Sequence, residues 1–152
     1  MQDVDSTEES GEINFSDYGV QLTRGFRALK LWMSLKTFGV DQFRDAIDHT
    51  LDLAQSAELL LRERTHIEIC TAAPMAVVTF RYLPPDASAL QTDELNLALV
   101  QALIKHGYAM LTSTQLADRT VLRFCTINPR TTQDDLVRTI EVLDELYADL
   151  IA

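Results

Sequence analysis

The side chains that most often carry chemistry are few in this chain, and they do not form a standard site. Its three histidines, His49, His66 and His106, pair neither with one another nor with Cys70 and Cys125 at the spacing of a metal site. No glycine-rich phosphate loop and no nucleophile elbow occurs. These residues alone therefore predict no catalytic machinery and no bound metal.

Charge is distributed unevenly along the chain. The net charge is −10, yet residues 1–17 hold six acids and no base, whereas residues 18–38 hold four bases and no acid. The acidic total argues against nucleic acid and anionic membranes as partners. The first segment has few apolar residues, so we expect an acidic, disordered leader over 1–17. The second segment is locally basic, although the net charge of the whole chain is negative.

Length and composition predict one globular domain with a short extension. A chain of 152 residues that is 47% hydrophobic can bury a sizeable core. No stretch approaches the roughly 18–20 apolar residues of a membrane span. Residues 1–11 are acidic, unlike a secretion signal. Two cysteines are too few for a disulfide framework, so we expect a cytoplasmic location, with Cys70 and Cys125 as small buried residues in strands.

Hydrophobic periodicity predicts helices and strands in a definite order. Helices are expected at 25–38, at 41–64 with Asp41 as N-cap, at 92–106 with Thr92 as N-cap, and from Thr131 or Thr132 onward. Strands are expected at 66–71, 76–82, 108–115 and 119–127, with a turn at 72–75. Because short links join the strands in pairs, the fold class is α+β, a four-stranded antiparallel sheet with helices on one face. The expected organisation is a leader at 1–17, a linker helix within 18–40 and a small domain at 41–152.

One segment is far more specific than these patterns. Residues 17–32, Asp-Tyr-Gly-Val-Gln-Leu-Thr-Arg-Gly-Phe-Arg-Ala-Leu-Lys-Leu-Trp, resemble the signature that follows the catalytic loop of group II pyridoxal-phosphate-dependent amino-acid decarboxylases. The likeness continues at 36–40, 64–70, 121–125 and 128–132 and covers about 11–152. It favours the aromatic-L-amino-acid and tyrosine decarboxylase type.

The resemblance implies that the chain is the C-terminal region of a fold-type I enzyme. The whole enzyme would remove the α-carboxylate of an L-amino acid with pyridoxal 5′-phosphate, as a homodimer. The large domain, which holds the cofactor lysine, would be this chain's partner. Lys30, Lys36 and Lys105 lack the family's His-Lys context, and no tyrosine precedes Tyr18 to match the loop tyrosine. We therefore expect no catalytic residue and no covalently bound cofactor here.

The resemblance assigns roles to residues of the signature. Thr23 falls at a position that lines the substrate side-chain pocket in the family. The alternative, with equal weight, is that Thr23 is an ordinary residue at the start of a helix. Arg24, Arg27 and Lys30 match a basic cluster near the active site and the domain junction, or alternatively form a solvated face. Gly25 departs from the pattern, because many relatives carry a second arginine there.

Three apolar residues of the same segment, Phe26, Leu29 and Trp32, are expected to pack at the domain junction. An exposed apolar patch around them would mark the place where the large domain docks. A different class of function stays open from the sequence. The chain could be a free-standing, noncatalytic α+β domain that self-associates or binds a partner, because function belongs to the site and not to the fold.

We expect the 152-residue chain alone to release no carbon dioxide from an aromatic L-amino acid in the presence of pyridoxal phosphate. The reason is that a cofactor enzyme must hold and orient its cofactor, and the lysine and tyrosine that do so in the family are missing here. The measurement compares carbon dioxide release with an enzyme-free blank containing the same cofactor. Release above that blank would contradict the interpretation.

Overall fold

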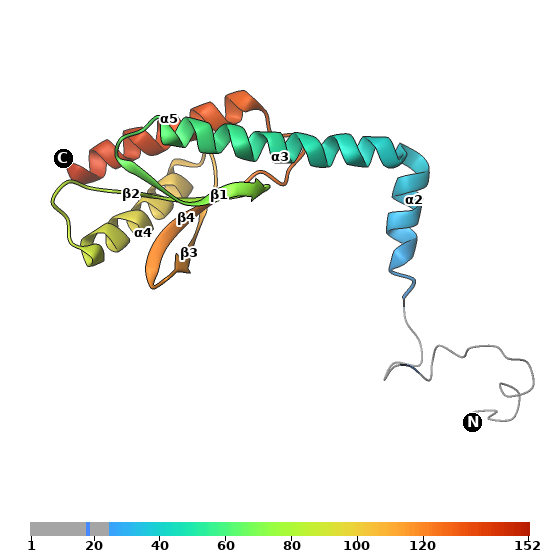
Figure 1. The fold of residues 1–152 in the computed structure, drawn as a ribbon, viewed down its shortest axis with the longest axis horizontal. Helices are drawn as coiled ribbons and strands as arrows, with labels where there is room; N and C mark the ends of the chain where they lie inside the picture. The colour runs from blue at the N-terminus through green and yellow to red at the C-terminus, as the bar shows by residue number, and fades with distance from the viewer. Residues whose placement is uncertain (1–17, 19–24) are drawn as a thin grey trace, which may run out of the picture. The chain divides into compact units, whose positions relative to one another are not determined.

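The structure, a computed structural model, describes Tyr18 and residues 25–152 (Figure 1), so the leader expected at 1–17 lies outside the described residues. The described residues fall into two units, one ending at Val40 and the other comprising Asp41–Ala152. The first unit contains helix α2, Ala28–Phe38. Helix α2 is capped at its C-terminus by Gly39, whose φ of 83° is a conformation that glycine adopts without strain.

The second unit has the element order that the sequence predicts. Its elements are α3 (Val40–Arg62, which begins at the unit boundary), β1 (Ile67–Met75), β2 (Val77–Tyr82), α4 (Ala89–His106), β3 (Thr112–Leu116), β4 (Arg119–Cys125) and α5 (Gln133–Ile151). The strands form one sheet in the order β1-β2-β4-β3, with every neighbouring pair antiparallel. The predicted α+β class with a four-stranded antiparallel sheet is confirmed.

The core lies on one face of this sheet. Cross-strand partners Phe80 and Leu122 are fully buried, and the alternate residues Val78 and Phe124 are buried beside them. On the opposite face Arg123 and Cys125 are exposed, although Thr79, Arg81 and Val121 are buried there too. The helices supply the other half of the same cluster, with residues that include Leu53, Ala57 and Leu61 of α3, Leu99 and Leu103 of α4, and Leu136, Ile140 and Leu143 of α5. One covered face is the arrangement predicted for these alternating strands.

Helix α4 is joined to the sheet through a buried side chain. Beyond the register pair Phe80–Leu122, no further pair joins β2 to β4. There the Tyr82 N–H donates to Asn96 Oδ1 at 2.9 Å, and Asn96 Nδ2 donates back to the Tyr82 carbonyl at 2.9 Å. Close by, the Asp93 carboxylate accepts from the Thr120 N–H at 3.0 Å. The side chains of α4 thus occupy the hydrogen-bonding positions that a neighbouring strand would fill.

Two of the predicted helix starts are wrong. Helix α4 begins three residues early because Ser88 and Gln91 form a capping box, in which each side chain bonds the other residue's backbone N–H. Thr92 instead donates its hydroxyl to the Ser88 carbonyl inside the first turn. Asp41 lies within the first turn of α3 and accepts from Arg44 at 2.7 Å.

The start of α5 is confirmed. Thr132 is its N-cap and forms a second capping box with Asp135. The Thr132 hydrogen bonds lower the pKa of the Asp135 carboxyl. Leu150 in the last turn of α5 is exposed at the surface.

The turn predicted at 72–75 is wrong, because β1 continues to Met75 and pairs there with Val77. The pairing of β1 with β2 is irregular here, with register shifts between Ile69 and Thr71 and between Thr71 and Met75. Pro74 fits in this strand because β1 is at the edge of the sheet. Glu58 of α3 accepts the Ala73 N–H at 2.7 Å, and this bond together with Arg62 lowers the pKa of the Glu58 carboxyl.

The cysteines lie in strands β1 and β4, as predicted, but Cys125 is exposed. Its register partner is Val77, and both lie on the face of the sheet away from the core. Cys70 is half-buried, and burial raises the pKa of its thiol, which makes that cysteine a poor nucleophile at neutral pH. None of the helices that the structure describes combines the length and the apolar character needed to cross a bilayer.

Replacing Asn96 with alanine is expected to lower the free energy of unfolding by about 3 kcal/mol, because two buried backbone groups of Tyr82 lose their partners. Urea unfolding followed by circular dichroism measures the change. The matched control is Gln101→Ala on the exposed side of α4, which should cost at most about 0.5 kcal/mol. Equal losses in the two variants would show that Asn96 does not fix α4 to the sheet.

Candidate functional site

Helix α2 exposes apolar side chains on several sides. None of its residues is buried. Phe26, just before the helix, is 70% exposed, and Trp32 is 57% exposed. The other exposed large apolar residues of this segment are Leu29, Leu31, Met33 and Phe38. A helix that is apolar on more than one side normally needs cover on more than one side, so this segment has the character of an interface.

Two basic residues at the start of the segment, Arg27 and Lys30, do not serve the stability of α2, unlike Lys36 in its last turn. Arg27 is at the N-cap position, where its side chain makes no capping bond, and Lys30 follows in the first turn, which holds no acid. Positive charge at a helix N-terminus opposes the helix dipole and costs roughly 0.3–1 kcal/mol per group. Among the described residues, no carboxylate lies within salt-bridge distance of either side chain. Thr23 and Arg24 lie outside the described residues.

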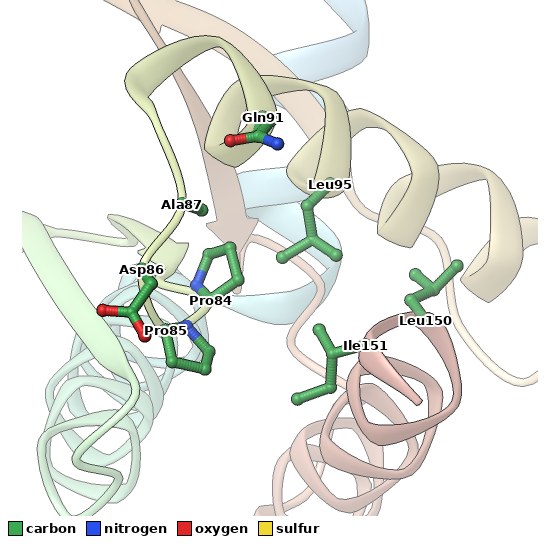
Figure 2. A pocket seen from close by; sticks show the side chains of 8 residues that line it. All are labelled: Pro84, Pro85, Asp86, Ala87, Gln91, Leu95, Leu150 and Ile151. Carbon is green, nitrogen blue, oxygen red and sulfur yellow. The ribbon is translucent and has the colours of Figure 1, made fainter.

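The described residues do not provide a pyridoxal-phosphate site by themselves. Lys30, Lys36 and Lys105 are exposed. A shallow pocket of about 350 Å³ lies between the β2–α4 loop, the start of α4 and the end of α5 (Figure 2). It is lined by Pro84, Pro85, Asp86, Ala87, Gln91, Leu95, Leu150 and Ile151. This lining has no lysine to bind an aldehyde and no basic group for a phosphate, so the pocket does not fit the cofactor.

The same lining cannot carry acid–base catalysis. Asp86 is its only titratable side chain, and Figure 2 shows Leu95 and Ile151 forming an apolar wall across the pocket. A general acid–base pair needs two groups within hydrogen-bonding reach of one substrate. Across the described part of the chain, no group of three or more potential metal ligands comes together either.

The structure assembles one polar cluster that the sequence did not reveal. Asp144 of α5 accepts hydrogen bonds from Arg64 Nε at 3.1 Å and from the Tyr82 hydroxyl at 2.9 Å, and its Oδ1 lies 3.2 Å from His66 Nε2. The His66 ring stacks on Tyr147 with centroids 4.9 Å apart. Burial raises the pKa of Tyr82, which keeps its hydroxyl protonated as a donor.

This cluster ties the residues just after α3 and strand β2 to α5. The Tyr82 side chain is fully buried, whereas Arg64, His66 and Asp144 are half-buried, and none of the four lines the pocket of Figure 2. No sequence signal could have found it, because 62 to 80 residues separate Asp144 from its partners.

The sequence matches the family described as "Pyridoxal-dependent decarboxylase conserved domain" over residues 6–83. It is 44% identical to an aromatic-L-amino-acid decarboxylase of Bacillus atrophaeus over 145 residues, which are 95% of this chain and 30% of that protein. It is 32% identical to tryptophan decarboxylase 2 of Oryza sativa subsp. japonica over 83% of this chain and 25% of that protein.

Solved structures give the same likeness. The crystal structure of Oryza sativa TDC with PLP and tryptamine superposes with a TM-score of 0.86 at 28% identity, over 96% of this chain and 31% of that one. Catharanthus roseus tryptophan decarboxylase in complex with L-tryptophan gives a TM-score of 0.79 at 28% identity, over 90% of this chain and 29% of that one. The chain therefore spans between 25% and 31% of the length of these relatives.

Trp32 is the only tryptophan in the chain, and its exposure leads to a stability prediction. We expect Trp32→Ala to change the free energy of unfolding of the 152-residue chain by at most about 0.5 kcal/mol. The buried control Leu99→Ala should cost about 2–5 kcal/mol. Urea unfolding followed by circular dichroism measures both. A loss of several kcal/mol for Trp32→Ala would mean that the chain itself covers α2, contrary to its interpretation as an interface.

Proposed function

Because the chain belongs to the pyridoxal-dependent decarboxylase family, we propose that it is the C-terminal portion of an enzyme that removes the α-carboxylate of an aromatic L-amino acid. The observation that carries the proposal is the 44% identity to an aromatic-L-amino-acid decarboxylase across 95% of this chain. The exposed apolar character of α2 adds a physical argument, since that helix has surfaces suited to a protein neighbour.

The activity belongs to the whole enzyme rather than to this portion. Pyridoxal phosphate, when bound, supplies the electron sink for loss of the carboxylate. The described residues offer no site for it, so we assign cofactor binding and catalysis to the large domain. This chain's residues would complete the enzyme by packing against that domain, with Phe26, Leu29 and Trp32 excluding water at the junction.

The basic cluster would set the orientation of that packing. Arg24, Arg27 and Lys30 would pair with carboxylates of the large domain or of a second subunit near the active site. Support for this role comes from α2, whose stability the two described members, Arg27 and Lys30, oppose rather than help. Charge pairs at the rim of an interface contribute more to register than to affinity.

Thr23 would line the substrate side-chain pocket of the whole enzyme. Its hydroxyl could hydrogen-bond a polar substituent, and its methyl group would narrow the pocket compared with glycine. The remaining walls of the pocket would come from the large domain, so Thr23 would contribute to the choice among aromatic substrates without determining it alone.

We further propose that the whole enzyme is a homodimer in the cytoplasm. Exposed apolar side chains on α2 are compatible with a buried position in such an assembly. The two cysteines are free, which suits a reducing compartment.

A chimera tests the proposed function. In the Bacillus atrophaeus enzyme, the segment that this chain matches is replaced by the corresponding residues of this chain. We expect the chimera to bind pyridoxal phosphate and to release carbon dioxide from L-tryptophan or L-tyrosine. The same enzyme with that segment deleted is the control and should be inactive. In the chimera, Thr23→Gly should alter the preference between the two substrates.

Two outcomes would count against the proposal. A folded chimera that binds the cofactor but releases no carbon dioxide would remove the assigned activity. A 152-residue chain that is a stable monomer and never associates with the remainder of the Bacillus enzyme, supplied as a separate protein, would favour a free-standing noncatalytic domain.

A further inference from the structure

Three large apolar side chains lie exposed at one end of the second unit. Ile47 of α3 is 57% exposed, Met75 at the end of β1 is 68% exposed, and Ile127 just after β4 is 72% exposed. Isolated apolar residues at a surface are ordinary, but apolar residues gathered from several segments indicate an interaction site. We call these three residues the end patch.

Hydrogen bonds around Thr126 bring the three segments together. The Thr126 N–H donates to the Ala76 carbonyl at 3.0 Å, and the Thr126 hydroxyl donates to the Thr50 carbonyl at 2.8 Å. The Thr50 hydroxyl in turn donates to the Ile47 carbonyl at 2.7 Å. These bonds place the backbones of the three segments side by side, and by its register with Val77, Met75 lies on the face of the sheet away from the core.

The apolar stripe of α3 runs past the core toward the same end. Buried residues of α3 begin at Thr50, yet Phe43 and Ala46 are half-buried and Ile47 is exposed on the turns before it. A stripe at helical spacing normally faces a packed surface along its whole length. The first turns of α3 thus carry the pattern of a covered helix without a covering element among the residues of this unit.

Resting on the proposed function, we propose that the end patch is a docking surface for the part of the decarboxylase that lies outside these 152 residues. The family match at 6–83 runs through two of its three segments, those with Ile47 and Met75. The similar structures cover 96% and 90% of this chain while exceeding it about threefold in length. The relatives therefore contain much protein beyond the part that this chain matches.

Charge favours that occupant over a second copy of the chain. The first three turns of α3 carry Asp41, Asp45 and Asp48 against one base, Arg44, so the helix beside the end patch is net acidic. Two copies meeting symmetrically through the patch would bring these acids toward each other, which is unfavourable. The covering surface should be apolar, with neutral or basic groups at its rim.

The test uses the chimera described above and the 152-residue chain in parallel. We expect Met75→Asp and Ile127→Asp to lower the Tm of the chimera by about 5 °C or more, because each would bury an unpaired carboxylate at the junction. In the 152-residue chain, where both positions are exposed, the same variants should shift the Tm by no more than about 2 °C.

Two further variants serve as controls. Leu59→Asp places the same charge on α3 at a residue that is 66% exposed, about 18 Å along the helix from Ile47, and should leave both proteins unchanged. Met75→Leu keeps an apolar side chain and should leave the Tm of the chimera at its original value.

The outcomes separate the end patch from the proposed function. An unaltered chimera that binds no pyridoxal phosphate overturns the proposed function and the patch with it. An active chimera in which the patch variants behave like Leu59→Asp overturns the patch alone. Equal losses in the chimera and the 152-residue chain would assign the patch to packing within this chain. A dimer of the 152-residue chain that the patch variants dissociate would assign it to self-association.

Discussion

The pairing of Asn96 with both backbone groups of Tyr82 determines how the helices meet the sheet. At this point β2 has no strand beside it on the β4 side, and its polar groups are buried. Buried backbone groups must be paired, so α4 can neither slide nor rotate without breaking that pairing. Helix α5 packs against α4. The placement of the last helix therefore depends in part on this amide side chain, together with the bonds that Asp144 of α5 makes to Arg64 and Tyr82.

The two units differ in how completely they bury their own apolar side chains. The second unit closes a core from three helices and a sheet, with residues such as Phe80, Leu99 and Ile140 fully buried. The first unit contains a regular helix whose apolar residues have no comparable cover. Sufficient size for folding is thus different from sufficient content for chemistry. The chain's length allows folding, whereas the pocket in the described residues has no lysine and no basic group in its lining.

Local patterns in the sequence predicted most of the fold. Periodicity and short links predicted the order of elements and the antiparallel sheet, and the sequence predicted the last helix start at Thr131 or Thr132. The Ser88–Gln91 capping box was also visible in the sequence, but Thr92 offered a competing cap four residues later. Strand alternation could not assign Cys125 to a face of the sheet, because that depends on which neighbours a strand acquires.

The site was less accessible to such reasoning. The roles proposed for Arg27 and Trp32 rest on a resemblance, because nothing in the spacing of basic and apolar residues identifies their partner. The cluster around Asp144 joins residues far apart in the chain, and local periodicity carries no information about such pairs. The end patch depends on three segments that meet only after the sheet has formed.

The exposed edge of β1 also affects whether another chain can add a strand to this sheet. A strand edge with free N–H groups invites another chain to extend the sheet, which is a route to aggregation. Here Pro74 has no N–H to offer, and Glu58 already occupies that of Ala73. The last residues of β1 therefore form a poor template for strand addition, so exposed apolar surface can persist on this domain without the sheet growing from that side.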